Sequence, residues 1–170
     1  MSADLSFLAK ARLDARQQLV ATLSQSERNE FDFHWEMIAR PSQIAPPGDW
    51  RIWLIMAGRG FGKTRAGAEW VRRIAEGQPE ARIALLSSAL TEDRSGMIEG
   101  ESGVLACCAP DRRPTFEPCW RRIRFPNGAQ AQIFSASDPE SLRGPQHSHA
   151  WCDEIGKWPL SAERATRSWN

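Results

Sequence analysis

The segment LIMAGRGFGKTRAGAEW, residues 54–70, constrains the fold of this chain more than any other stretch. Apolar residues lead into a loop with three glycines, which is followed by a Lys-Thr pair and a helical pattern. Glycines let a backbone curl so that its N–H groups point inward around an anion. A helix that begins directly after the loop adds the positive end of its dipole. The segment therefore predicts a strand, a phosphate-binding loop and a helix in succession.

Residues 57–64, AGRGFGKT, fit the Walker A pattern, with alanine in place of the more usual first glycine. In this pattern Lys63 reaches the β- and γ-phosphates of a nucleotide, and the Thr64 hydroxyl ligates Mg²⁺. The predicted phosphate contacts come from Gly58, Arg59, Gly60, Phe61, Gly62, Lys63 and Thr64. We therefore expect ATP and Mg²⁺ to bind at this loop.

Arg59 is a second cation in the loop, although one lysine is enough for a plain nucleotide-binding loop. An arginine here can neutralise the charge that develops on the γ-phosphate during hydrolysis. The alternative is an arginine that only faces solvent. We favour the first interpretation.

Two neighbouring acids, Asp153 and Glu154, follow an expected strand in the segment HAWCDEIGKW, residues 149–158. ATP hydrolysis needs one carboxylate on the Mg²⁺ side and another to polarise the attacking water. Asp153 is predicted for the metal and Glu154 for the general base. Taken alone, such a pair is more often a solvated turn, but the phosphate loop upstream favours a hydrolytic site. A kinase has less need of a water-activating glutamate, so ATP hydrolysis coupled to mechanical work is preferred.

The rest of the chain predicts an α/β protein, with helices on the faces of a mostly parallel sheet. Residues 4–39 read as helical, with a capping box at Ser24 and Glu27, and form an N-terminal segment over 1–40. A proline-rich stretch at 40–50 opens the main domain, 41–170. The expected elements are a buried strand at 52–56, a helix at 63–76, a strand at 82–88, a short helix at 91–99, a hairpin within 115–135 and a strand from 149.

The composition of the chain excludes some classes of protein. The chain has 170 residues and a formal net charge of +1, which excludes an acidic disordered tail and a strongly basic nucleic-acid coat. Four cysteines without a C-x-x-C pair are expected to be reduced thiols. With no secretory signal and no membrane-spanning run, a cytoplasmic location is expected.

Several segments in one collinear series resemble a known family. Besides GRGFGKTRAGAEW they are ESGVLA, PTFEP, IRFPNGAQAQIFSA, SLRGPQH and AWCDEIGKW. The series is similar to the ATPase half of large terminase subunits, the DNA-packaging motors of tailed bacteriophages and gene transfer agents. The resemblance covers about residues 35–160.

The resemblance implies a P-loop ATPase fold of the additional-strand, catalytic-glutamate type. It makes Gly58–Thr64 the Walker A loop, Asp153 the Walker B aspartate and Glu154 the catalytic base. Arg59 matches an arginine that contacts the γ-phosphate in many terminases, and Gln43 is a loosely matching adenine-side contact. The implied partners are double-stranded DNA, a portal protein on a procapsid, a small terminase subunit and further copies of the chain on the portal, with no membrane.

The sequence departs from that family pattern in its extent. Terminases continue to a motif that couples ATP hydrolysis to DNA movement and then to a nuclease domain, whereas this sequence ends at Asn170. We therefore expect an incomplete ATPase domain without nuclease activity. Two other functions stay open: another nucleic-acid-stimulated P-loop ATPase such as a helicase, and a truncated remnant that only binds nucleotide.

Other residues have competing interpretations. The arginines around the hairpin suit contact with DNA phosphates or with a neighbouring subunit's ATP, but a solvated face is favoured; they are Arg112, Arg113, Arg121, Arg122 and Arg124. Arg143, on a loop before the acidic strand, is evenly balanced between a site role and none. His147, His149 and Cys152 lack a fourth zinc ligand, so structural roles are favoured. The eight tryptophans suit base stacking or packing, and packing is favoured because they are scattered.

Overall fold

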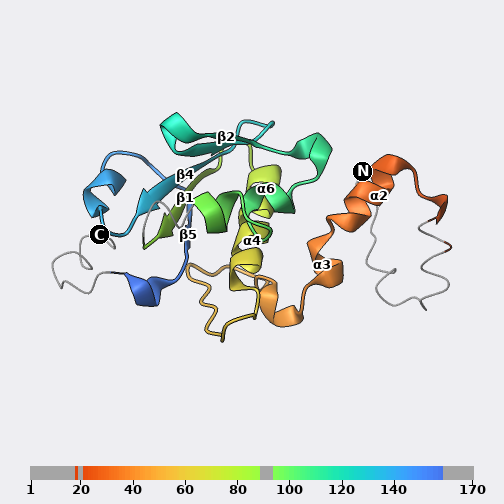
Figure 1. The fold of residues 1–170 in the computed structure, drawn as a ribbon, viewed down its shortest axis with the longest axis horizontal. Helices are drawn as coiled ribbons and strands as arrows, with labels where there is room; N and C mark the ends of the chain where they lie inside the picture. The colour runs from red at the N-terminus through yellow and green to blue at the C-terminus, as the bar shows by residue number, and fades with distance from the viewer. Residues whose placement is uncertain (1–17, 19–20, 89–93, 159–170) are drawn as a thin grey trace. The chain divides into compact units, whose positions relative to one another are not determined.

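The structure is a computed structural model that describes residues 18, 21–88 and 94–158 (Figure 1). Its contacts divide the chain into two compact units, Met1–Ile55 and Met56–Asn170, which we describe separately. The predicted division after residue 40 and the predicted incompleteness of the main domain stay predictions.

The first unit contains short helices. They are α2 (Gln25–Asp32), α3 (Trp35–Ile38) and the 3₁₀ turn η2 (Pro41–Gln43). The capping box is confirmed, because the Ser24 N–H donates to Glu27 Oε2 at 2.8 Å and the Glu27 N–H donates to Ser24 Oγ at 3.3 Å. Residues 33–34 interrupt the helical segment expected over 4–39, whose first part lies outside the described residues.

The second unit alternates helices and strands around one sheet. Its elements are α4 (Lys63–Gly77), β1 (Arg82–Ser87), the π-helical turn η3 (Arg94–Ile98), α6 (Val104–Cys107), η4 (Pro110–Arg112), β2 (Thr115–Glu117), η5 (Pro118–Trp120), β3 (Arg122–Arg124), β4 (Gln130–Ser135), η6 (Pro139–Leu142), β5 (His149–Cys152) and η7 (Ile155–Lys157). The helix predicted at 63–76 and the strands predicted at 82–88 and from 149 are confirmed. The short helix predicted at 91–99 partly coincides with η3, and its residues 91–93 lie outside the described residues.

The sheet is mixed, so the prediction of a mostly parallel sheet was wrong. The strand order is β2-β3-β4-β1-β5 (Figure 1). β1 pairs in parallel with β4 and β5, whereas β2 with β3 and β3 with β4 pair antiparallel. The reason is that the hairpin strands join the same sheet as the buried parallel strands. The α/β class itself is confirmed.

The hairpin predicted around residues 126–128 is confirmed. The Gly128 N–H donates to Phe125 O, and the Phe125 N–H donates to Ala129 O, each at 3.0 Å. Gly128 has φ of 104°, a left-handed conformation that glycine adopts without steric cost. The Asn127 side-chain amide donates to Ala75 O at 2.7 Å, which ties the turn to the last part of α4.

The buried strand predicted at 52–56 is not formed. Residues 52–58 carry no helix or strand assignment. Three apolar side chains of the run are exposed, Ile52 at 74%, Leu54 at 63% and Met56 at 84%. An apolar run becomes a buried strand only when a neighbouring strand pairs with its backbone, and here it has no such partner among the described residues.

Apolar side chains cover both faces of β1. Ile83 and Leu85 belong to the large core cluster, together with Val71 of α4. Ala84 and Leu86 belong to a smaller cluster that includes Phe134. A continuous apolar run with both faces buried is typical of a parallel strand in an α/β sheet.

Helix α4 packs closely against strand β5. A Cβ atom on Gly67 would lie 2.2 Å from the Trp151 ring, so only glycine fits at this crossing. Trp151 is 8% exposed and belongs to the large core cluster. This contact fixes the start of α4 relative to the strand that precedes Asp153.

Candidate nucleotide site

The glycine loop between residue 57 and α4 contains two left-handed glycines. Gly60 and Gly62 have φ of 78° and 86°, whereas Gly58 is not left-handed. Gly62 is the N-cap of α4, and its carbonyl accepts the Ala66 N–H at 3.0 Å. The first helical N–H groups of α4 are therefore aimed at the loop, as an anion site requires.

Lys63 is bonded within its own loop. Its Nζ donates to Ala57 O at 2.9 Å and to Gly58 O at 3.0 Å. Both acceptors are neutral carbonyls, so the ammonium charge is not balanced by a carboxylate in these contacts. The lysine thus holds the two ends of the loop together and keeps its charge beside the helix N-terminus.

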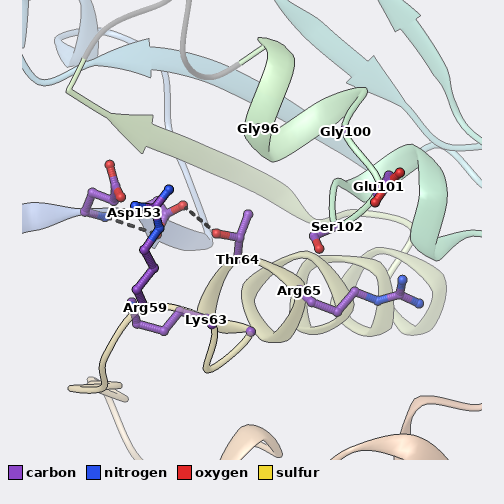
Figure 2. Close-up of a pocket in the computed structure, with 12 residues that line it drawn as sticks. Arg59, Lys63, Thr64, Arg65, Gly96, Gly100, Glu101, Ser102 and Asp153 are labelled. Atoms are coloured by element: carbon purple, nitrogen blue, oxygen red, sulfur yellow. Dashed lines mark hydrogen bonds between the residues drawn. The ribbon is translucent and has the colours of Figure 1, made fainter.

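Thr64 and Asp153 meet across the sheet edge. The Thr64 hydroxyl donates to Asp153 Oδ2 at 3.3 Å, although the residues are 89 apart in sequence (Figure 2). The Asp153 N–H donates to Leu86 O at 2.8 Å, which continues the pairing of β1 with β5 by one residue. The start of α4 and the acidic end of β5 therefore lie side by side.

Asp153 is a half-buried carboxylate. Burial raises its pKa above the ordinary value for aspartate, against the opposing effects of the Glu154 N–H and Thr64 hydroxyl that it accepts and of the nearby Lys63 charge. Its Oδ1 accepts the Glu154 N–H at 3.1 Å. A carboxylate held this way loses part of its hydration, so a bound cation would stabilise its charged form.

Glu154 is exposed and has an unusual backbone. Its φ of 47° and ψ of 46° are left-handed, a conformation that costs energy for a residue with a Cβ atom. Its Oε2 forms an ion pair with Lys157 Nζ at 2.5 Å. Two acids that are neighbours in sequence thus have different surroundings, Asp153 bonded towards α4 and Glu154 held by its own turn.

A cleft of about 500 Å³ joins these residues. The loop and α4 contribute Arg59, Gly60, Gly62, Lys63, Thr64 and Arg65, and the strand end contributes Asp153 and Glu154. The opposite wall comes from the segment after β1, with Gly96, Gly100, Glu101 and Ser102. Figure 2 shows the Arg59 side chain extending from the loop towards Asp153, whereas Arg65 points away along α4.

Three predicted nucleotide-contact residues do not line the cleft. Gly58 and Phe61 belong to the loop but lie outside its lining. Gln43 belongs to the first unit, where it is buried and its Oε1 accepts the Arg40 N–H at 2.9 Å. Its role at a nucleotide stays a prediction.

Sequence reasoning missed the opposite wall and Arg65. The sequence signals for the wall were the glycines and the serine clustered in residues 96–103 and the segment ESGVLA, but neither indicated a place in the cleft. Arg65 is held by a fully buried carboxylate, because its guanidinium donates to Glu69 Oε1 at 2.6 and 2.9 Å. Arg72 donates to the other oxygen of Glu69 at 2.8 Å, so two arginines compensate one buried charge.

The hairpin arginines are partly neutralised. Arg122 donates twice to Glu117 Oε2, at 2.6 and 2.8 Å, and Arg124 lies 3.6 Å from the same carboxylate. Arg112 lies 3.9 Å from Asp111. Arg143 pairs with Glu140 at 2.7 Å and does not line the cleft. These pairs agree with a solvated face, and the site roles of these arginines stay untested.

The residues considered for zinc have other surroundings. His147 packs edge-on against Phe134, and its ring nitrogens have no hydrogen-bond partner among the described residues. His149 Nδ1 lies 2.9 Å from Ser148 Oγ. Burial raises the pKa of the Cys152 thiol to about 11, which disfavours the thiolate that zinc requires. Within the described residues, no three His, Cys, Asp or Glu side chains form a metal-binding group.

Fold and site together define an α/β protein with a glycine loop at a helix N-terminus beside an acidic strand end. The sequence model of one family, the N-terminal part of terminase large subunits of the T4-like virus type, matches residues 54–167. That span is more than half of the chain, and the chain belongs to this family. Comparison with curated proteins and with solved structures gives no match. In the part of the chain that the structure describes, no helix is long and apolar enough to span a membrane.

Proposed function

We propose that this chain is the ATP-hydrolysing motor domain of a terminase large subunit, with a P-loop fold of the additional-strand, catalytic-glutamate type. Its turnover would drive double-stranded DNA into a procapsid, with a portal protein, a small terminase subunit and further copies of the chain as partners. Family membership supports a role in DNA packaging. The ATPase assignment depends on the site.

The observation that carries the proposal is the hydrogen bond between Thr64 and Asp153. Each belongs to a motif that is common by itself, a glycine loop and an acidic pair. Residues of the glycine loop and of the acidic pair line one cleft, although nothing in their local sequence requires this, and this supports the proposal. A hydroxyl and a carboxylate side by side are the oxygen ligands that Mg²⁺ uses in nucleotide sites.

The residues present fit ATP with Mg²⁺. The cleft of about 500 Å³ is within the usual size of ligand sites. Magnesium keeps several waters and takes few protein ligands beside substrate phosphates, which suits Thr64 and Asp153 as its protein ligands. When bound, Mg²⁺ supplies positive charge that neutralises the phosphates.

The other cleft residues then have distinct tasks. The N-terminus of α4 and Lys63 hold the phosphates. Lys63 exchanges its hydrogen bonds to Ala57 O and Gly58 O for bonds to phosphate oxygens. Arg59 neutralises charge on the γ-phosphate from within the same chain. Glu154 orients a water and accepts its proton. The water oxygen bonds to the γ-phosphorus, the bond to the bridging oxygen breaks, and ADP and phosphate leave.

ATP turnover and ATP binding by the purified chain test the proposal. Lys63→Ala should abolish Mg-ATP binding, because it removes the cation at the phosphates.

Glu154→Gln should keep ATP binding and lower turnover by about 10² to 10⁴, the usual contribution of a general base. Glu80→Gln, at an exposed turn outside the cleft, is the matched control and should turn over normally. Normal hydrolysis by Glu154→Gln would remove this residue from its role.

A further inference from the structure

Lys157 lies three residues after Glu154 and holds its carboxylate. The ion pair joins Lys157 Nζ to Glu154 Oε2 at 2.5 Å across the short turn η7. Glu154 lines the cleft and Lys157 does not. The lysine therefore approaches the proposed base from outside the nucleotide site, and neither family membership nor the loop motif assigns it a role.

The turn that carries this pair is fixed at several points. The Lys157 N–H donates to Glu154 O at 2.8 Å, and the Trp158 indole donates to Asp153 O at 3.1 Å. Glu154 itself is left-handed, one of two non-glycine residues with positive φ among those described. A strained backbone conformation persists only where surrounding contacts maintain it, and such positions concentrate at functional sites.

The ion pair between Lys157 and Glu154 is too exposed to contribute much to the stability of the fold. The side chains of Lys157 and Glu154 are 59% and 48% exposed, and solvent-exposed ion pairs contribute little to folding. The ion pair can instead orient the Glu154 carboxylate. A glutamate side chain with three free torsions samples many positions. A cation on one oxygen restricts those positions and leaves the other oxygen for a water.

We propose that Lys157 is a positioning residue for hydrolysis, holding Oε2 of Glu154 so that Oε1 is presented to the attacking water. This inference rests on the proposed function. It follows the general arrangement in which a base is oriented by a third group within hydrogen-bond reach. Lys157 contacts neither the nucleotide nor the water in this account, and acts only through Glu154.

The test compares Lys157→Ala, Lys157→Arg and the double variant Glu154→Gln/Lys157→Ala in steady-state ATP hydrolysis. Lys157→Ala should lower kcat by about tenfold, the scale of a modest misplacement of a catalytic group, while KM for ATP changes less than twofold. Lys157→Arg should recover most of the loss. In the Glu154→Gln background, Lys157→Ala should cause no further loss, because no general base remains to be positioned.

The control is Glu140→Gln, which breaks the pair between Glu140 and Arg143. That pair has the same spacing of three residues and joins Glu140 of the 3₁₀ turn η6 to its C-cap residue Arg143. It is similarly exposed, at 49% and 69%. Its kcat should equal that of the wild type. An unchanged or raised kcat in Lys157→Ala, or a further loss in the double variant, overturns the inference alone. Absence of wild-type turnover overturns it together with the proposed function.

Discussion

The two cations of the glycine loop are held differently. Lys63 donates to two carbonyls of its own loop, whereas the exposed Arg59 side chain extends towards the acidic strand end (Figure 2). Lys63 thus maintains the loop shape as well as carrying charge. Arg59 lines the cleft, and we therefore expect its role to lie in contacts with a bound nucleotide.

At Arg59 we predict a catalytic rather than a structural loss. Arg59→Ala should lower ATP turnover by about 10³, the lower end of the contribution of an arginine finger, with an unchanged unfolding temperature. Arg73→Ala, an exposed arginine on α4 outside the cleft, is the control. If Arg59→Ala weakens neither ATP affinity nor turnover, Arg59 is an ordinary solvent-facing arginine.

At the residue scale, the two motifs could be found in the sequence because the residues of each are neighbours in the chain. Three glycines at 58, 60 and 62 predict a curled loop, and two of them, Gly60 and Gly62, are left-handed. The meeting of Thr64 with Asp153 was expected only from the resemblance and the paired motifs. The wall at Gly96–Ser102 could not be expected, because its place depends on how the chain returns after β1.

At the scale of helices and strands, the predictions were correct where the sequence signal is local. They were wrong where the element needs a partner strand that the local sequence does not specify. The helix over 63–76 and the hairpin turn have local signals, and both formed. The apolar run at 52–56 has the composition of a buried strand, yet strand formation needs a paired neighbour that composition does not supply. The hairpin strands joined the main sheet for a similar reason, since alternation predicts a strand but not the sheet to which it belongs.

The crossing of α4 and β5 can be tested with two glycines of the same helix. Gly67→Ala should lower the free energy of unfolding by about 2 kcal/mol, because the new methyl group overlaps the Trp151 ring. Gly77→Ala meets nothing within 4 Å and should be neutral or stabilising by about 0.5 kcal/mol. Urea unfolding measures both. Equal stabilities of the two variants would contradict the close packing of this crossing.

At the scale of the whole molecule, sheet topology explains where the cleft lies. β1 pairs in parallel with β5, so the two strands end at the same edge of the sheet, and Asp153 is the first residue beyond β5. The start of α4 lies at that edge, as the bond between Thr64 and Asp153 shows. Ligands of α/β sheets commonly bind at the carboxyl ends of the strands.

The central claim is that the loop and the acidic strand end form one site for nucleotide with Mg²⁺. The most direct measurement is calorimetric titration of a non-hydrolysable ATP analogue into the chain, with Mg²⁺ or with EDTA, for wild type, Thr64→Ala and Asp153→Asn. The account predicts one site per chain, with affinity at least about tenfold weaker in EDTA, equivalent to about 1.4 kcal/mol. Both variants should lose most of this Mg²⁺ dependence. Absence of binding, or equal affinity with and without Mg²⁺ in all three proteins, would contradict it.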